Sequence, residues 1–182
     1  MIYNDIHELA QNLQYAKEAY KGIVCTSGGF DPLHVGHLRC LQESKTRSDE
    51  ILVVIVNGDG FLTRKKGKPF MSFDERIEII RALRCVDFAI GWDDGSQNVL
   101  GALEILKPHI FTKGGDRSSR DKVVEADLCD KLGITIRYGV GGTNKIQSSS
   151  DLIKNSKECE HNWVLDGHNA GDPICSKCYK RE

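Results

Sequence analysis

The sequence has no apolar run long enough to cross a bilayer, and its first residues lack the basic and apolar regions of a secretory signal. It also has little net charge: 25 basic against 26 acidic side chains give −1 at pH 7, so nothing draws the whole chain to nucleic acid or anionic membranes. Its seven cysteines have no regular spacing, which argues against a disulfide framework. We therefore expect a cytoplasmic protein with reduced thiols that does not act in a membrane.

The 182 residues suit one α/β domain with a small appendage. Short apolar runs alternate with amphipathic segments, which predicts βαβ units and a parallel, doubly wound, Rossmann-like sheet of five strands. The predicted strands are residues 22–26, 50–56, 86–90, 109–112 and 134–138. The predicted helices are residues 5–20, 35–45, 72–83, 96–106, 120–132 and 148–155. We divide the chain into an N-terminal helix packed on the domain (1–21), the α/β domain (22–155) and a tail (156–182).

The segment after the first predicted strand, GGFDPLHVGH over residues 28–37, is the most informative. A glycine pair lets the backbone approach a ligand closely, and the free N–H groups of the helix that begins near Val35 favour phosphate. His34 and His37 are close enough in this helix to face one site, and Gly36 leaves space between them. The segment therefore predicts a phosphate site at the carboxyl end of a parallel strand.

This segment resembles the G-x-F-D-x-x-H-x-G-H signature of the cytidylyltransferase-like nucleotidyltransferases. The resemblance implies a HUP-type fold and an enzyme that transfers a nucleoside monophosphate from a nucleoside triphosphate to a small phosphorylated acceptor, with release of pyrophosphate. It implies that His34 and His37 contact the triphosphate and stabilise the transition state, with a catalytic Mg²⁺ bridging phosphate oxygens. The other residues that it places at the nucleotide here are Gly28, Gly29, Phe30, Asp31 and Gly36.

Other stretches match the same superfamily. The polar, basic segment 58–71, predicted as a loop, is where the family places a lysine that reaches the triphosphate. Lys65, Lys66 and Lys68 are alternatives that spacing does not separate, and we expect the catalytic role to fall to Lys66 and Lys68. Arg76 opens the next predicted helix, behind a capping box; the matching arginine assists the phosphates or the active-site wall, although a surface residue in a capping turn is nearly as reasonable.

Two turns complete the resemblance. The first, Lys113-Gly114-Gly115-Asp116, follows the fourth predicted strand, where the family binds the base and ribose. The second holds hydroxyl groups that cap a helix and donate to phosphate oxygens, with Ser148 the expected cap and Ser149 and Ser150 the expected phosphate ligands. Simple turn and capping roles are the alternatives.

Within the superfamily, the best match is the adenylyltransferase part of the bacterial ADP-heptose synthases. It rests on VNGDGFLTRKKGKP, ERIEIIRALRCVDFAIGW and LKPHIFTKGGDR, and the resemblance covers residues 22–155. This match implies ATP and a sugar phosphate such as heptose 1-phosphate, and relatives are often homodimers. The extra N-terminal helix, the tail and the unusual Gln147-Ser-Ser-Ser sequence leave the acceptor open, so a cytidylyltransferase acting on glycerol 3-phosphate or another phospho-alcohol is an alternative.

The tail is polar and too short for a core of its own, so it needs a staple or stays disordered. A zinc-knuckle-like structural site of three cysteines and one histidine would provide one, with His168 as a substitute for the histidine. The predicted ligands are Cys159, His161, Cys175 and Cys178. A function of another class, a zinc-ribbon nucleic-acid-binding module, is opposed by the net charge and by the few basic residues of the tail.

Overall fold

A computed structural model describes residues 3–19, 22–115, 117–142, 147–157, 163–164 and 174–175. The chain forms two compact units, residues 1–146 and residues 147–182, so the second unit begins earlier than the tail predicted from residue 156. No helix in the described part of the chain is long and apolar enough to span a membrane.

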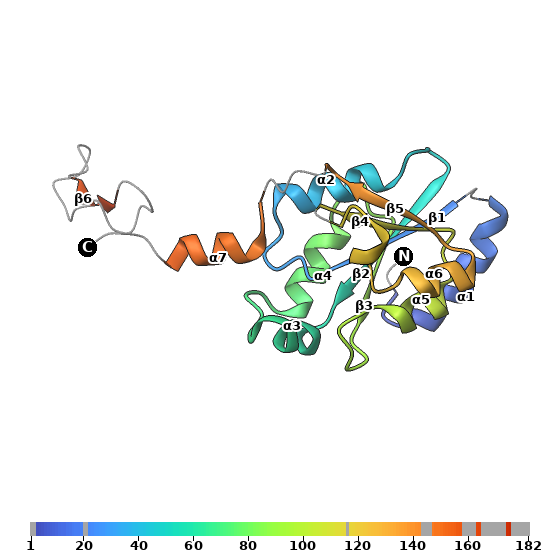
Figure 1. Cartoon of the computed structure of the whole chain (residues 1–182), viewed down its shortest axis with the longest axis horizontal. Helices are drawn as coiled ribbons and strands as arrows, with labels where there is room; N and C mark the ends of the chain where they lie inside the picture. The colour runs from blue at the N-terminus through green and yellow to red at the C-terminus, as the bar shows by residue number, and fades with distance from the viewer. Residues whose placement is uncertain are drawn as a thin grey trace. The chain divides into compact units, whose positions relative to one another are not determined.

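The first unit contains a five-stranded, fully parallel sheet, which confirms the predicted fold class (Figure 1). Its strands are β1 (Gly22–Gly28), β2 (Glu50–Asn57), β3 (Phe88–Trp92), β4 (Ile110–Gly114) and β5 (Thr135–Val140). They lie in the order β3-β2-β1-β4-β5, so that β3 and β5 form the two edges. The chain runs outward from β1 in both directions, which places the switch point, where such sheets bind ligands, between β1 and β4.

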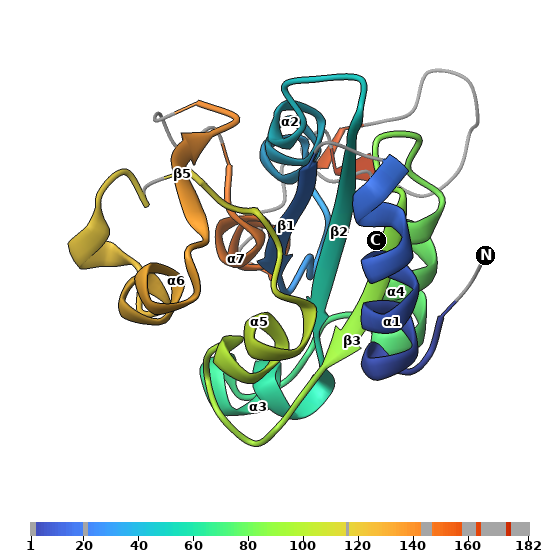
Figure 2. The ribbon, with the colours of Figure 1, turned by 90° about the vertical axis from the view of Figure 1, so that its right-hand side faces the viewer.

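Helices cover both faces of this sheet (Figure 2). They are α1 (Ile6–Ala19), α2 (Val35–Ser44), α3 (Asp59–Lys66), α4 (Phe73–Arg81), α5 (Leu100–Leu106) and α6 (Ala126–Leu132), with a 3-10 turn over Arg120–Lys122. Residues from α1, α5 and α6 join one apolar core cluster, and residues from α2 and α4 join the other. Because both faces are covered, every residue of β2 is buried.

The N-terminal helix α1 is part of this core. Leu9 and Leu13 are almost fully buried in the same cluster as β-strand residues and α5. Ahead of the helix, the Tyr3 ring lies 5.7 Å from the Phe88 ring, measured between centroids. Arg81 of α4 donates to the Tyr3 carbonyl at 2.7 Å and to the Ala89 carbonyl at 3.4 Å, and so joins this segment to the edge strand β3.

The clearest difference from the predicted elements is α3, because residues 58–71 were expected to form a loop. The helix has few apolar residues and hence little helical periodicity, so only the residues at its start and end indicate a helix in the sequence. Gly58 stands at the N-cap, and Gly67 ends the helix in the left-handed region at φ 88°. Arg64, Lys65 and Lys66 occupy its last turn, where positive charge favours a helix C-terminus.

In the second unit, the structure describes α7 (Ser149–Lys157) and a short antiparallel pair of strands, β6 (Trp163–Val164) and β7 (Ile174–Cys175). In these two strands Trp163 is paired with Cys175. The Ser148 hydroxyl accepts a hydrogen bond from the Asp151 N–H at 3.1 Å, which confirms the predicted cap of this helix.

Candidate functional site

The signature turn brings its two histidines together at the start of α2. The rings of His34 and His37 are stacked, with centroids 3.7 Å apart. His34 is also the N-cap of α2, because its Nδ1 atom accepts a hydrogen bond from the His37 N–H at 3.4 Å. With Nδ1 as the acceptor, the proton of a neutral His34 imidazole lies on Nε2. One helix start therefore presents two imidazoles together with free N–H groups, a combination suited to an anion.

His37 is the more enclosed of the two rings. Burial lowers the pKa of its imidazole from 6.5 to about 4, and the neighbouring His34 ring adds to this shift. The Phe30 ring packs against it edge-on, with centroids 5.1 Å apart. Its Nδ1 atom is buried and has no hydrogen-bond partner in the described part of the structure. His37 is therefore neutral at physiological pH, with a buried polar atom that a ligand oxygen would satisfy.

The glycine pair before the histidines has a packing role in this structure. A Cβ atom on Gly28 would lie 2.9 Å from the Phe30 ring, and one on Gly29 would lie 2.7 Å from the Leu62 side chain. Phe30 itself adopts the left-handed region at φ 50°. The missing side chains thus let the turn fold tightly against Phe30 and against Leu62 of α3.

Asp31 of the signature ties this turn to the lysine segment. Its carboxylate accepts from the N–H groups of Phe70 and Met71 at 2.8 and 2.7 Å and pairs with the Lys66 ammonium at 2.5 Å. Lys66 also donates to the Asp31 carbonyl at 2.8 Å. Burial by itself would raise the pKa of Asp31, but Lys66 and the two N–H groups outweigh it and the pKa is lowered. The carboxylate is thus fully engaged inside the protein.

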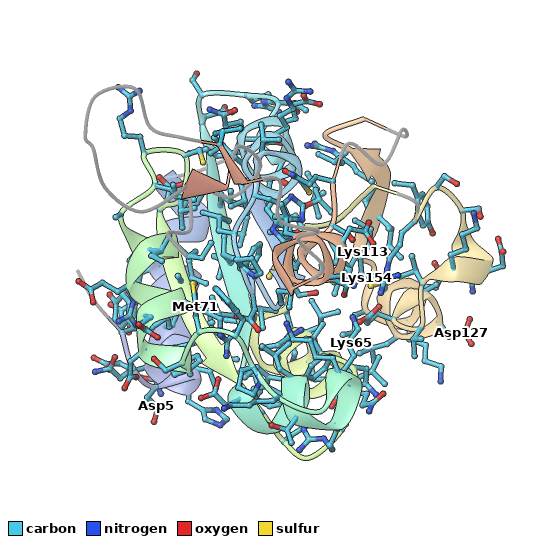
Figure 3. All side chains as sticks on the ribbon, turned by 90° about the vertical axis from the view of Figure 1, so that its left-hand side faces the viewer. Asp5, Lys65, Met71, Lys113, Asp127 and Lys154 are labelled. Atoms are coloured by element: carbon cyan, nitrogen blue, oxygen red, sulfur yellow. The ribbon has the colours of Figure 1, made fainter. Side chains whose placement is uncertain are left out.

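These contacts distinguish the three candidate lysines. All three are exposed residues, and Lys66 reaches the signature turn through the carboxylate and the carbonyl of Asp31. Figure 3 labels Lys65 on α3, Met71 ahead of α4 and Lys113 at the end of β4. The structure therefore brings His34, His37, Asp31 and Lys66 into one neighbourhood.

Arg76 lies below this neighbourhood, not on its surface. Its side chain is 0% exposed, and it donates to the carbonyls of Gly29 and Asn57 at 2.7 Å each. It also pairs with Asp59 at 2.6 Å and donates to the Met71 carbonyl at 3.2 Å. These contacts hold the guanidinium in the interior, which rules out the surface position that the sequence left as an alternative.

Lys113 occupies the other side of the switch point, at the end of β4. Its ammonium group lies 3.2 Å from the Glu125 carboxylate and 3.3 Å from the Ser27 hydroxyl at the end of β1, and it sits 4.4 Å from the Phe111 ring centroid. Burial lowers the pKa of Lys113, although Glu125 acts in the opposite direction. Of the turn that follows, Gly114 and Gly115 are described, and Asp116 lies outside the described residues.

The other predicted ligands belong to the second unit. Ser148, Ser149 and Ser150 are at and after the cap of α7. Of the predicted zinc ligands, Cys159, His161 and Cys178 lie outside the described residues, as does the alternative His168, and only the backbone of Cys175 is described. The remaining thiols, those of Cys25, Cys40, Cys85 and Cys129, are free, as the sequence predicts.

Sequence reasoning missed two aspartates that organise the site. Asp59 accepts from Arg76 and from the Phe73 N–H at 3.1 Å, and Asp93 accepts from the Phe61 N–H at 2.9 Å and pairs with Arg64. Asp59 comes two residues after the buried strand β2, and Asp93 comes directly after β3. That position, at the carboxyl edge of a parallel sheet, is the signal that could have found them.

Comparison with known proteins gives a family for this arrangement. The family model described as cytidylyltransferase-like matches residues 25–134, which include the signature turn, the lysine segment and Lys113. The chain is 35% identical over 150 residues to the bifunctional protein HldE of Geotalea uraniireducens, covering 79% of this chain and 30% of that protein. It is 32% identical over 160 residues to the HldE protein of Aliarcobacter butzleri, covering 87% and 31%. The chain thus spans about a third of the length of these relatives.

Two solved structures are also similar to this chain. The lipopolysaccharide core biosynthesis protein of Thermoplasma volcanium is 32% identical with a TM-score of 0.54, covering 64% of this chain and 93% of that one. Pantothenate synthetase of Thermus thermophilus, 16% identical with a TM-score of 0.52, covers 84% of this chain and 67% of that one and shares the fold. These findings confirm the resemblance drawn from the sequence, including the similarity to the ADP-heptose synthases: the chain belongs to the cytidylyltransferase-like family of nucleotidyltransferases.

Proposed function

We propose that this protein transfers AMP from ATP to a sugar phosphate such as heptose 1-phosphate and releases pyrophosphate. The observation that carries the proposal is the stacked pair His34 and His37 at the start of α2, beside a lysine held against the same turn. Similarity to the HldE proteins favours a sugar phosphate acceptor and adenylyl transfer.

The reaction is an in-line displacement. A phosphate oxygen of the acceptor forms a bond to the α-phosphorus of ATP, and the bond from that phosphorus to the oxygen bridging to the β-phosphate breaks, so that pyrophosphate leaves. Such a reaction needs positioning and charge stabilisation more than covalent help from the protein. The Nε2–H of His34 donates to a phosphate oxygen, and the unpartnered Nδ1 atom of His37 makes a second contact to the phosphates.

Lys66 carries positive charge to the leaving phosphates. Its ammonium is paired with Asp31, and the two N–H groups of Phe70 and Met71 would still bind the Asp31 carboxylate if the lysine turned to the phosphates. The triphosphate therefore competes with one internal carboxylate for this lysine. Gly28, Gly29, Phe30 and Gly36 form the turn that shapes the phosphate site, and Lys66 is the lysine that we assign in preference to Lys68.

On the other side of the switch point, Lys113 and the turn with Gly114, Gly115 and Asp116 take the base and ribose. From the resemblance to the family alone, we also propose Ser148, Ser149 and Ser150, at the start of α7, as phosphate ligands.

Magnesium enters as part of the nucleotide substrate. Within the described residues, no group of three histidine, cysteine, aspartate or glutamate side chains is arranged to hold a metal ion. The carboxylate of Asp31 is already occupied by a lysine and two N–H groups. Mg²⁺ bound through phosphate oxygens and several waters needs no dedicated protein cage, and it supplies neutralisation of the phosphate charge.

A matrix of four nucleoside triphosphates against sugar and polyol phosphates, scored by pyrophosphate release with Mg²⁺, tests this function. We expect ATP with an aldose 1-phosphate to give the highest kcat/KM. CTP with glycerol 3-phosphate as the preferred pair would replace our acceptor and nucleotide, and no release with any pair would overturn the proposal. A His34→Ala sample in each well identifies release by contaminants.

We also propose that the tail holds one structural zinc ion, bound by Cys159, His161, Cys175 and Cys178. The pairing of Trp163 with Cys175 supports this set, because in the sequence His161 comes shortly before the paired Trp163, whereas His168 lies between the two strands. Four protein ligands close a tetrahedral site, so the ion would have no catalytic position. Metal analysis of the purified protein should find one zinc per chain; none, after purification without chelators, would refute the site.

A further inference from the structure

Arg76 has the largest side chain that the described structure buries completely. An arginine keeps its charge in a protein, and a buried charge is costly unless partners surround it. Arg76 has such partners: four of its five N–H donors are used, by Gly29, Asn57, Asp59 and Met71. The Phe73 ring covers it, with its centroid 5.8 Å from the guanidinium carbon.

These partners come from separate segments that all border the site. Gly29 belongs to the signature turn after β1, and Asn57 ends β2. Asp59 opens α3, the helix that carries Lys66, and Met71 precedes α4. One planar group with fixed donor directions thus sets the relative positions of the histidine turn and the lysine helix.

Met71 shows how closely the two parts are joined. Its N–H donates to the Asp31 carboxylate at 2.7 Å, and its carbonyl accepts from Arg76 at 3.2 Å. The segment that returns from α3 is therefore held on one side by the signature aspartate and on the other by the buried guanidinium. Asp31 also binds Lys66, so a shift at Met71 is transmitted to the lysine.

We propose that Arg76 is a positioning residue that fixes Lys66 and the signature turn relative to each other, without contacting the nucleotide. The proposal rests on the proposed function, because it assigns Lys66 and the histidines to the triphosphate. Interactions made mainly in the transition state depend most on this geometry. Loss of the Arg76 guanidinium, with its fixed fork of N–H donors, therefore lowers kcat more than it changes the KM for ATP.

Arg81 provides a matched control. It lies on the same helix α4, and its guanidinium also donates to backbone carbonyls, but those belong to Tyr3 and Ala89, away from the signature turn. Arg76→Lys and Arg81→Lys both keep the charge and remove the fork. We expect both to lower the melting temperature, and only Arg76→Lys to lower kcat, by about tenfold or more, with a much smaller change in KM.

Two further measurements separate positioning from general destabilisation. Amide hydrogen exchange of residues 66–72 should become faster in Arg76→Lys and stay at the wild-type rate in Arg81→Lys. In Arg76→Ala, added guanidinium ions should restore part of kcat by occupying the vacated space, whereas in Arg81→Ala they should leave kcat unchanged.

The proposal is overturned if folded Arg76→Lys keeps the wild-type kcat and the wild-type exchange rate over residues 66–72. It is also overturned if KM for ATP rises while kcat stays constant, since that result indicates direct nucleotide binding. If the wild-type protein releases no pyrophosphate with any substrate pair, the proposed function fails, and the exchange comparison still decides whether Arg76 holds the lysine segment. Arg76→Lys preserves this test if Arg76→Ala does not fold.

Discussion

At the scale of single residues, the stacked imidazoles at positions 34 and 37 have the most direct consequence. His34→Ala and His37→Ala should each lower kcat by on the order of 10²-fold or more, because each removes a group directed at charge that develops in the transition state. Circular dichroism and melting curves should show folded proteins. A folded variant with unchanged turnover would remove that histidine from the mechanism.

A second residue-scale prediction concerns pH. The folded protein holds the pKa of His37 at about 4, against 6.5 for an ordinary histidine, so between these values the unfolded chain binds a proton that the folded chain refuses. Stability must therefore fall as pH decreases from about 6.5 to about 4. Urea unfolding across this range should show a shallower fall for His37→Gln than for the wild type. Equal slopes for the two proteins would mean that His37 titrates normally in the folded state.

The site itself could be predicted only in part from the sequence. The histidines and the lysine segment are local patterns that adjoin strand ends. The partners of Arg76 are backbone carbonyls of Gly29 and Asn57, which have no residue-type signature and meet only when the sheet is assembled. The same holds for the choice of Lys66, which depends on its contact with Asp31.

At the scale of elements, α3 depends on a cap supplied from another part of the chain. Asp93, after β3, accepts from the Phe61 N–H in the first turn of α3 and pairs with Arg64 one turn later. A Cβ on Gly60 would lie only 2.5 Å from this carboxylate, so the helix start is built around it. Such caps have the effect of ordinary N-caps although they are distant in sequence.

Asp93→Ala should therefore lower the free energy of unfolding by about 1 kcal/mol and speed amide exchange in α3. The neighbouring Asp94→Ala is the control, since Asp94 accepts from Ser96 within its own loop. Chemical denaturation of both variants measures the difference. Equal losses would show that Asp93 acts on its loop alone and leaves α3 uncapped.

Most strands and helices were predictable because parallel strands are buried on both faces and read as continuous apolar runs. Their ends were less predictable. β3 begins two residues later than expected, at Phe88, and the segment predicted as one helix over 120–132 is a 3-10 turn followed by α6. Helix α3 was missed because its few apolar residues give little helical periodicity and because the carboxylate that caps it, Asp93, is distant in sequence.

At the scale of the whole molecule, the first unit includes its N-terminal helix as core. Leu13 is 1% exposed among residues of the sheet and α5, so Leu13→Ala should destabilise the protein by about 2–5 kcal/mol. Tyr15→Ala, on the same helix and 83% exposed, should change little. Melting and urea curves of both variants test this. If Leu13→Ala were as stable as Tyr15→Ala, α1 would be an appendage that the domain does not need.

The contact between the Arg81 guanidinium and the Ala89 carbonyl has a consequence for self-association at high protein concentration. An edge strand with open backbone groups is a template on which another chain adds a strand. Here Arg81 and the Tyr3 segment lie against the outer side of β3, and any incoming strand must first displace a charged group and an aromatic ring. This margin of the sheet is thereby protected against uncontrolled self-association.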